Sequence, residues 1–136
     1  MKITVVCSGG WGTALALLLV ENGHDVTLWS HRPEKAEELR RTRENPMLKG
    51  VTLPETMHFT ADLACVADCG AVLMVTPSYA VRETAAKLRA FLRPGTVVIS
   101  ASKGIDKSYC QSFSRDYCFG KCSRKYKCNC WDGLYY

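Results

Sequence analysis

Short apolar segments alternate with longer segments of mixed character along the first hundred residues. The short ones are rich in β-branched side chains and end at glycine, proline or polar residues, which indicates strands. The longer ones carry apolar positions at helical spacing or are rich in Ala, Leu and charged residues, which indicates helices. We expect strands at 2–6, 25–29, 57–60, 71–75 and 96–100, and helices at 11–22, 34–43, 61–66 and 79–92.

Residues at the expected helix ends support these boundaries. Gly23 follows the first helix, in the place where glycine commonly ends helices. Pro33 precedes the second helix, and proline suits the first helical turn. Ser78 stands just before the helix at 79–92, so we expect its hydroxyl to cap that helix. Residues 45–54, with two prolines and a glycine, should form a loop.

The strand pattern indicates how the sheet is built. Two of the expected strands, of which 71–75 is the plainest, are apolar throughout instead of alternating with polar residues. Such strands are covered on both faces, as in a parallel sheet, and the intervening helices supply the crossovers that parallel strands need. The sequence therefore predicts an α/β domain with a doubly wound parallel sheet over residues 1–106.

Length and composition narrow the class of protein. The chain has 136 residues, the length of one domain. It is 47% hydrophobic and 23% charged, as ordinary globular proteins are, which excludes a disordered or low-complexity chain. No apolar run approaches the roughly 20 residues that cross a bilayer, and no cleavable secretory leader is evident. We therefore expect a cytoplasmic protein with no membrane span.

Charge and cysteine are unevenly divided along the chain. Residues 1–106 hold 12 Lys/Arg and 11 Asp/Glu, whereas residues 107–136 hold 6 and 2. Segment 107–136 also holds five of the eight cysteines and five of the six tyrosines. The net charge of +5 thus belongs mostly to this segment, and it does not make the whole chain a specific nucleic-acid binder.

A glycine-rich turn follows the first strand. In a dinucleotide-binding turn, glycines occupy positions one, three and six, which here are Cys7, Gly9 and Gly12. Gly9 would let the backbone approach a pyrophosphate, and Gly12 would let the helix pack closely on the strand. The helix N-terminus would direct free N–H groups at the phosphates. The turn therefore predicts a dinucleotide site; the alternative is a tight turn without a ligand.

The end of the second strand bears on which dinucleotide binds. An NAD site places Asp or Glu about 20 residues beyond the glycines, where the carboxylate bonds the ribose 2′-hydroxyl. Here the sequence is Ser30-His31-Arg32, with no acid. The guanidinium of Arg32 could pair with a 2′-phosphate, and Ser30 and His31 could add donors. This pattern favours NADP and leaves NAD open; the alternative for Arg32 is a solvated loop position.

The remaining titratable residues predict little chemistry. The three histidines, with Cys65 and Cys69, lack the spacing of a metal site. We expect Cys65 and Cys69 to be reduced, buried thiols. Cys7 lies at the candidate site, but no base is paired with it in the sequence that would make it a nucleophile.

Several sequence blocks in a fixed order carry a family resemblance. They are GGWGTALA at 9–16, WSHR at 29–32, ENP at 44–46 with Leu48, Gly50-Val51 and Leu53-Pro54 after it, Val75-x-Pro77-Ser78, and SKGI at 102–105. In this order and spacing they resemble the N-terminal cofactor-binding domain of bacterial NAD(P)-dependent glycerol-3-phosphate dehydrogenase. The resemblance covers residues 1 to about 106 and implies a Rossmann-type fold for them.

The resemblance also implies an activity and a set of site residues. The activity is reduction of dihydroxyacetone phosphate to sn-glycerol 3-phosphate, which feeds phospholipid synthesis. The implied cofactor contacts, together with the turn glycines, are Gly9, Gly10, Trp11, Gly12, His31, Arg32 and Lys103. By the same resemblance Lys103 would also bind substrate, which agrees with its place after a parallel strand, at the edge of the sheet where ligands bind. In the family a second, helical domain supplies the acid–base lysine, so this chain would hold no catalytic residue; the full-length enzyme could be a homo-oligomer.

Two features depart from the family pattern. Cys7 stands where the family has its first glycine, and cofactor affinity falls if the turn needs a conformation that only glycine tolerates. The resemblance ends near Asp106, and residues 107–136 match neither the rest of the domain nor the second domain. For this Cys-rich tail three hypotheses stand, in this order: out-of-frame residues after a frameshift, a disordered basic interaction tail, and a metal module whose cysteine spacing fits poorly.

Two functions therefore compete at this point. The first is the cofactor-binding part of an NADP-dependent glycerol-3-phosphate dehydrogenase, incomplete and inactive alone. The second is a non-catalytic nucleotide-binding module whose Cys-rich basic tail engages a partner.

Overall fold

The computed structural model describes residues 1–102 and 127–130. The strands are β1 (Lys2–Val6), β2 (Asp25–Trp29), β3 (His58–Thr60), β4 (Ala71–Met74), β5 (Val97–Ser100) and β6 (Lys127–Cys130). The helices are α1 (Gly10–Glu21), α2 (Pro33–Thr42) and α3 (Val81–Leu88), with 3₁₀ helices η1 (Leu63–Asp68) and η2 (Ser78–Ala80). The strands predicted between residues 2 and 100 are thereby confirmed, with small shifts at their ends, and the segment expected as a helix at 61–66 is the 3₁₀ helix η1.

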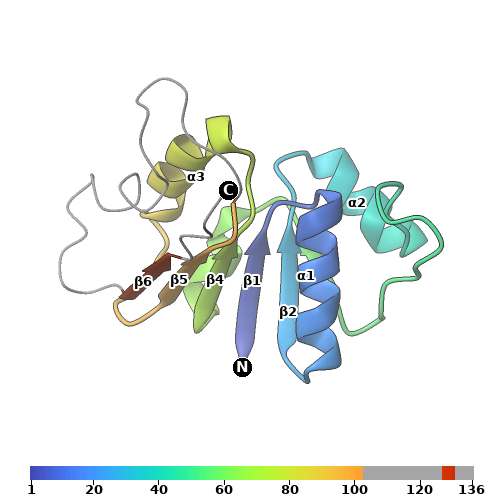
Figure 1. Ribbon diagram of the computed structural model, residues 1–136, viewed down its shortest axis with the longest axis horizontal. Helices are drawn as coiled ribbons and strands as arrows, with labels where there is room; N and C mark the ends of the chain where they lie inside the picture. The colour runs from blue at the N-terminus through green and yellow to red at the C-terminus, as the bar shows by residue number, and fades with distance from the viewer. Residues whose placement is uncertain (103–126, 131–136) are drawn as a thin grey trace, which may run out of the picture.

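The strands form one parallel sheet (Figure 1). The order is β3-β2-β1-β4-β5, with β6 beside β5. Val6 at the end of β1 is in register with Trp29 of β2 on one side and Met74 of β4 on the other. The chain winds outward from β1 through β2 to β3, then crosses back to β4 and winds outward again, so the strand order reverses between β1 and β4. The predicted doubly wound, Rossmann-type α/β fold is confirmed.

Hydrophobic cores fill both faces of the sheet. In Figure 1, α1 runs beside β2, and it contacts both β2 and β1. The core on this side includes Val5, Val26 and Leu28 from the strands, with Ala16 from α1 and Leu39 from α2. The opposite core includes Val6, Val72, Met74 and Val98 from the strands, with Val66 from η1 and Leu88 from α3. Neighbouring residues Val5 and Val6 thus enter different cores, which explains why the strands are apolar without alternation.

The expected cap at Ser78 is wrong. Pro77 is followed by the 3₁₀ helix η2, in which the Ala80 N–H donates to the Pro77 carbonyl at 2.9 Å. The helix α3 begins only at Val81, with Ala80 as its N-cap residue and no side-chain cap. Ser78 therefore lies inside a tight turn rather than at the helix start, because the proline closes that turn before α3 can begin.

The segment at 107–136 contributes one described element. Residues 127–130 form β6, in which Lys127 is in register with Val97 of β5. No pattern in the sequence indicated this strand. The other residues of the segment lie outside the described residues, and so does the expected boundary at 106. The boundary and the character of the tail therefore stay predictions.

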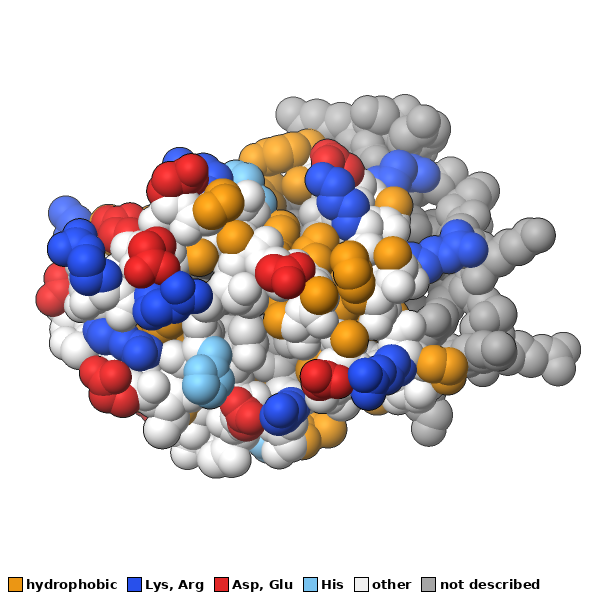
Figure 2. Space-filling view, turned by 180° about the vertical axis from the view of Figure 1, so that it is seen from behind, with side chains coloured by type: hydrophobic (Ala, Val, Ile, Leu, Met, Phe, Trp, Pro, Cys, Tyr) orange, Lys and Arg blue, Asp and Glu red, His pale blue; other side chains and the backbone are white. Residues whose placement is uncertain are grey.

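The back of the molecule carries mixed charge. Figure 2 shows Lys/Arg and Asp/Glu side chains interspersed over this face, with hydrophobic side chains gathered near its middle. Interspersed charges of opposite sign partly cancel and build no strong local field. Among the helices within residues 1–102, none is long and apolar enough to cross a membrane.

Arg43 fastens the loop after α2 to the rest of the domain. It ends α2 in the left-handed region, with φ 56°. Its guanidinium donates to the carbonyls of Pro54 at 3.1 Å and Met57 at 2.8 Å. The same group pairs with Glu55 at 3.4 Å and lies 5.1 Å from the centroid of the Phe59 ring. Arg43 thereby fixes both ends of the 43–57 segment.

Removing the Arg43 side chain should destabilise the fold. We expect Arg43→Ala to lower the free energy of unfolding by about 1.5 kcal/mol, because two carbonyls lose a charged donor at a partly exposed site. The free energy of unfolding of Arg43→Lys should lie between those of Arg43→Ala and the wild type, because an ammonium cannot donate to two carbonyls in the forked geometry of a guanidinium. Urea denaturation measures both, with the exposed Arg41→Ala as control. Equal losses at positions 41 and 43 would contradict the role of Arg43.

Candidate functional site

The turn between β1 and α1 is built for close backbone contact with a ligand. The Cys7 N–H donates to the Trp29 carbonyl at 3.1 Å, which continues the strand ladder to the end of the sheet. α1 then begins at Gly10, with Gly9 as an extended N-cap residue that has no side-chain cap. The Thr13 N–H donates to the Gly9 carbonyl at 2.9 Å, which is the first bond of the helix. The Gly10 N–H precedes this first bond, and a helix N-terminus of this kind is suited to an anion.

Two glycines give the turn its shape, Gly12 by allowing a close approach of helix and strand and Gly9 by leaving open space. A Cβ at Gly12 would lie 2.0 Å from the Cys7 carbonyl oxygen, so only glycine lets α1 start this close to the end of β1. A Cβ at Gly9 would meet nothing nearer than the Cys7 Sγ at 3.7 Å, so the turn is open there. This crowded Gly12 and open Gly9 match what a dinucleotide turn requires of its glycines. The residues present thus fit a pyrophosphate at this turn.

Cys7 takes a conformation that suits glycine. Its φ is 120°, a region that side chains with a Cβ rarely adopt. The side chain is half-buried and packs against the core on the α1 side of the sheet. The sequence raised the question of whether this turn takes a glycine-favouring conformation at the first position, and the φ value shows that it does. The consequence for cofactor affinity stays a prediction.

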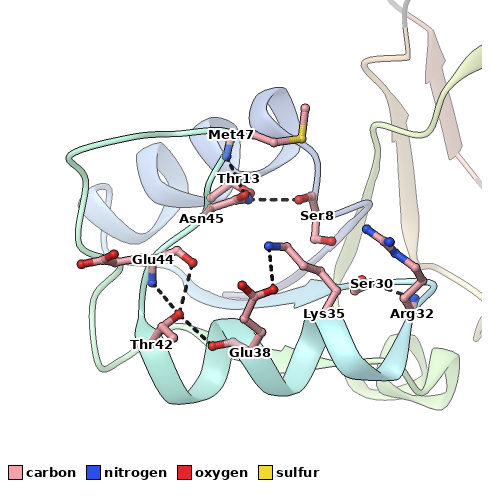
Figure 3. Close-up of polar contacts among 10 residues, drawn as sticks. All are labelled: Ser8, Thr13, Ser30, Arg32, Lys35, Glu38, Thr42, Glu44, Asn45 and Met47. Atoms are coloured by element: carbon pink, nitrogen blue, oxygen red, sulfur yellow. Dashed lines mark hydrogen bonds and ion pairs between the residues drawn. The ribbon is translucent and has the colours of Figure 1, made fainter.

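The end of β2 brings basic side chains to the same edge of the sheet. Ser30 is buried, and its Oγ accepts from the Arg32 N–H at 3.4 Å. His31 and Arg32 are exposed. Figure 3 shows the Arg32 side chain directed toward the turn that carries Ser8. The structure thus brings His31 and Arg32 to the same edge of the sheet as the glycine turn, as parallel neighbours β1 and β2 require.

Lys35 is a site residue that sequence reasoning missed. Its side chain is 14% exposed, and its Nζ lies 3.1 Å from Glu38 Oε2. In Figure 3 it extends from α2 toward the turn, as Arg32 does. The available signal was its spacing, because a residue three positions after Arg32 lies on the same face of the helix that starts there.

Asn45 was noted only as part of a sequence block, yet it contacts the turn directly. It is 2% exposed. Its Nδ2 donates to the Ser8 carbonyl at 3.0 Å and to Thr13 Oγ1 at 2.6 Å (Figure 3). Its Oδ1 accepts from the Met47 N–H at 3.1 Å. The loop after α2 is therefore anchored on the glycine turn.

Two of the expected site residues remain to be placed. Trp11 is 50% exposed in the first turn of α1. Lys103 lies outside the described residues, so its expected contacts with cofactor and substrate stay predictions. Within residues 1–102 and 127–130, no group of three or more His, Cys, Asp or Glu could hold a metal ion.

The thiols of η1 are not set up as nucleophiles. Burial raises the pKa of Cys65 to about 11 and raises the pKa of Cys69 as well. The Cys69 Sγ also donates to the Val66 carbonyl at 3.2 Å. Both thiols are free and, with raised pKa values, stay protonated at neutral pH. Cys69 is buried as predicted, whereas Cys65 is half-buried, and the reduced state stays a prediction.

Comparison with known proteins gives a consistent result. The family model for the N-terminus of NAD-dependent glycerol-3-phosphate dehydrogenase matches residues 2–116. The glycerol-3-phosphate dehydrogenase (NAD(P)+) of Geobacter sp. strain M21 is 45% identical over 118 residues, which are 85% of this chain and 35% of that protein. Its counterpart in Moorella thermoacetica is 50% identical over 107 residues, 77% of this chain and 32% of that protein. This chain thus spans about a third of the length of these relatives.

Solved structures agree with the sequence relatives. The glycerol-3-phosphate dehydrogenase of Coxiella burnetii matches with a TM-score of 0.79 and 27% identity, over 85% of this chain and 36% of that one. The enzyme of the same name from Saccharomyces cerevisiae matches with a TM-score of 0.74 and 22% identity, over 96% of this chain and 41% of that one, which supports the fold alone.

Proposed function

The chain belongs to the NAD-dependent glycerol-3-phosphate dehydrogenase family, whose N-terminal NAD(P)-binding domain it carries, and from this premise we propose that it binds NADP at the β1–α1 turn. The observation that carries the proposal is that α1 starts so close to the end of β1 that a Cβ at Gly12 would lie 2.0 Å from the Cys7 carbonyl oxygen, and that this helix start has no side-chain cap. That arrangement brings backbone N–H groups together where a pyrophosphate would accept them.

The residues around the turn would bind the other parts of the cofactor. Gly9, Gly10 and Trp11 would hold the pyrophosphate, and the exposed Trp11 ring offers an apolar surface beside it. Arg32 and Lys35 would bind a 2′-phosphate as charge-assisted donors, with His31 next to them. When bound, the reduced nicotinamide supplies a hydride.

The reaction proposed for the whole protein is reduction of dihydroxyacetone phosphate to sn-glycerol 3-phosphate in the cytoplasm, for phospholipid synthesis. Lys103 would bind cofactor and substrate, where its ammonium could hold the phosphate or polarise the carbonyl. The acid–base lysine would come from a further domain of the family, and the complete enzyme could assemble as a homo-oligomer. We therefore expect cofactor binding without turnover by this chain alone.

Paired measurements test the proposal. Titration calorimetry should show saturable NADPH binding to the 136-residue chain. NADPH oxidation with dihydroxyacetone phosphate should not exceed the rate without protein. Absence of NADPH binding would refute the cofactor assignment, whereas robust turnover would refute the view that the catalytic residues lie elsewhere.

The two basic residues predict a preference between cofactors. We expect Arg32→Ser to weaken NADPH binding about tenfold, because one charged hydrogen bond is worth about 1.5 kcal/mol. NADH affinity should change less than about twofold, since it carries no 2′-phosphate for the guanidinium to bind. Lys35→Gln should give the same selective loss, and the exposed Arg41→Ser is the matched control. A parallel fall for NADPH and NADH would argue against a 2′-phosphate contact.

A further inference from the structure

Asn45 is buried between the loop after α2 and the glycine turn, and all of its amide groups are engaged. Both donors of Nδ2 are used, on the Ser8 carbonyl and on Thr13 Oγ1. Its Oδ1 accepts from the Met47 N–H, which fixes which way the amide faces. Figure 3 shows Asn45 reaching from the loop to Ser8 and Thr13.

These bonds act on the carbonyls of the turn. The Ser8 carbonyl is held by Asn45, and the Gly9 carbonyl is held by the N–H and hydroxyl of Thr13, each at 2.9 Å. A trans peptide is planar, so its C=O and the following N–H point in opposite directions. Holding the Ser8 and Gly9 carbonyls on the Asn45 and Thr13 side therefore turns the N–H groups of Gly9 and Gly10 to the other side.

We propose that Asn45 is a positioning residue for dinucleotide binding: through the Ser8 carbonyl and Thr13 it orients the turn N–H groups that receive the pyrophosphate, without touching the cofactor. The inference rests on the proposed function, because it concerns the same turn. It adds a residue from a different element, 37 positions along the chain from Ser8.

The network requires an amide at position 45, and side-chain size alone does not satisfy it. The Thr13 hydroxyl donates its hydrogen to the Gly9 carbonyl, so its oxygen is left as an acceptor. The Ser8 carbonyl is also an acceptor. Asparagine offers an N–H donor to each of these two acceptors. An aspartate of equal size would instead place a carboxylate oxygen, itself an acceptor, against them. The aspartate would still accept from the Met47 N–H, so the loop keeps one anchor.

Asn45→Asp is therefore the discriminating variant. We expect it to weaken NADPH binding about tenfold, as the loss of well-placed donors implies. Affinity for 2′-AMP, which has the 2′-phosphate but no pyrophosphate, should change less than about twofold, because its contacts are with α2. Asn45→Ala, which adds no charge, should also weaken NADPH binding selectively. The amide resonance of Gly9 should move in the ligand-free Asn45→Asp protein.

A matched control separates the turn from a general effect. Asn22→Asp makes the same chemical change at an exposed helix end, where the Asn22 Nδ2 donates to Leu18 at 2.7 Å. It should leave both affinities and the Gly9 resonance unchanged. Unaltered NADPH binding by Asn45→Asp, or an equal fall for NADPH and 2′-AMP, would overturn the inference alone. If the wild-type chain binds no NADPH, the proposed function fails and this inference fails with it.

Discussion

Gly12→Ala is expected to abolish NADPH binding and to lower the free energy of unfolding by about 3 kcal/mol, the upper part of the range for overpacked sites. The added Cβ would lie 2.0 Å from the Cys7 carbonyl oxygen, well inside the 3.0 Å below which real Cβ contacts essentially never occur. The neighbour is backbone at the end of β1, which cannot rotate away. α1 must therefore move off the sheet, and its first-turn N–H groups move with it.

Gly9→Ala is the matched control for this substitution. Both glycines belong to the same turn, but a Cβ at Gly9 would contact only the Cys7 Sγ at 3.7 Å, and Gly9 has φ −69°. We expect its free energy of unfolding to stay within about 0.5 kcal/mol of wild type. Thermal unfolding of both variants makes the comparison, since Gly9 itself belongs to the proposed pyrophosphate site. Equal losses of stability at positions 9 and 12 would show that the crowding at Gly12 is not what the turn depends on.

The strands and the glycine turn were predictable because their signals are local. The apolar run at Ala71–Met74 and the β-branched run at Lys2–Val6 each suffice to indicate a strand buried on both faces. Gly12 was predicted from spacing alone, and the physical reason for that spacing is that a Cβ at this position would lie only 2.0 Å from the Cys7 carbonyl oxygen. The regular part of the fold and the position of the site therefore followed from short-range pattern.

The remaining site residues depend on contacts that no local pattern shows. Asn45 reaches Thr13 across 32 positions of sequence, and only the folded chain brings the two together. Lys35 was not identified because α2 carries several charged side chains, and the sequence leaves open which of them faces the turn. Ser78 failed as a cap because Pro77 closes a 3₁₀ turn first, which local cap preference does not include. The strand β6, of sequence KCNC, has no β-branched or aromatic residue, and its pairing with β5 is a tertiary contact.

Cys7→Gly is expected to stabilise the turn and strengthen cofactor binding. The φ of 120° at Cys7 costs a side chain on the order of 2 kcal/mol, because a Cβ crowds the backbone in this region. Glycine removes that cost, although it loses the contacts of the half-buried thiol and some chain entropy. Cys7→Ala separates these contributions, since alanine loses the thiol but keeps the Cβ.

We therefore expect Cys7→Gly to exceed Cys7→Ala in free energy of unfolding by about 2 kcal/mol, the reverse of the usual order of these residues. NADPH should bind more tightly to the glycine variant than to wild type, because a relaxed turn presents its N–H groups without distortion. Urea denaturation and calorimetric titration of the three proteins measure both effects. If alanine is tolerated as well as glycine, the turn is not strained at Cys7, and the departure from the family's glycine has no energetic consequence for the cofactor.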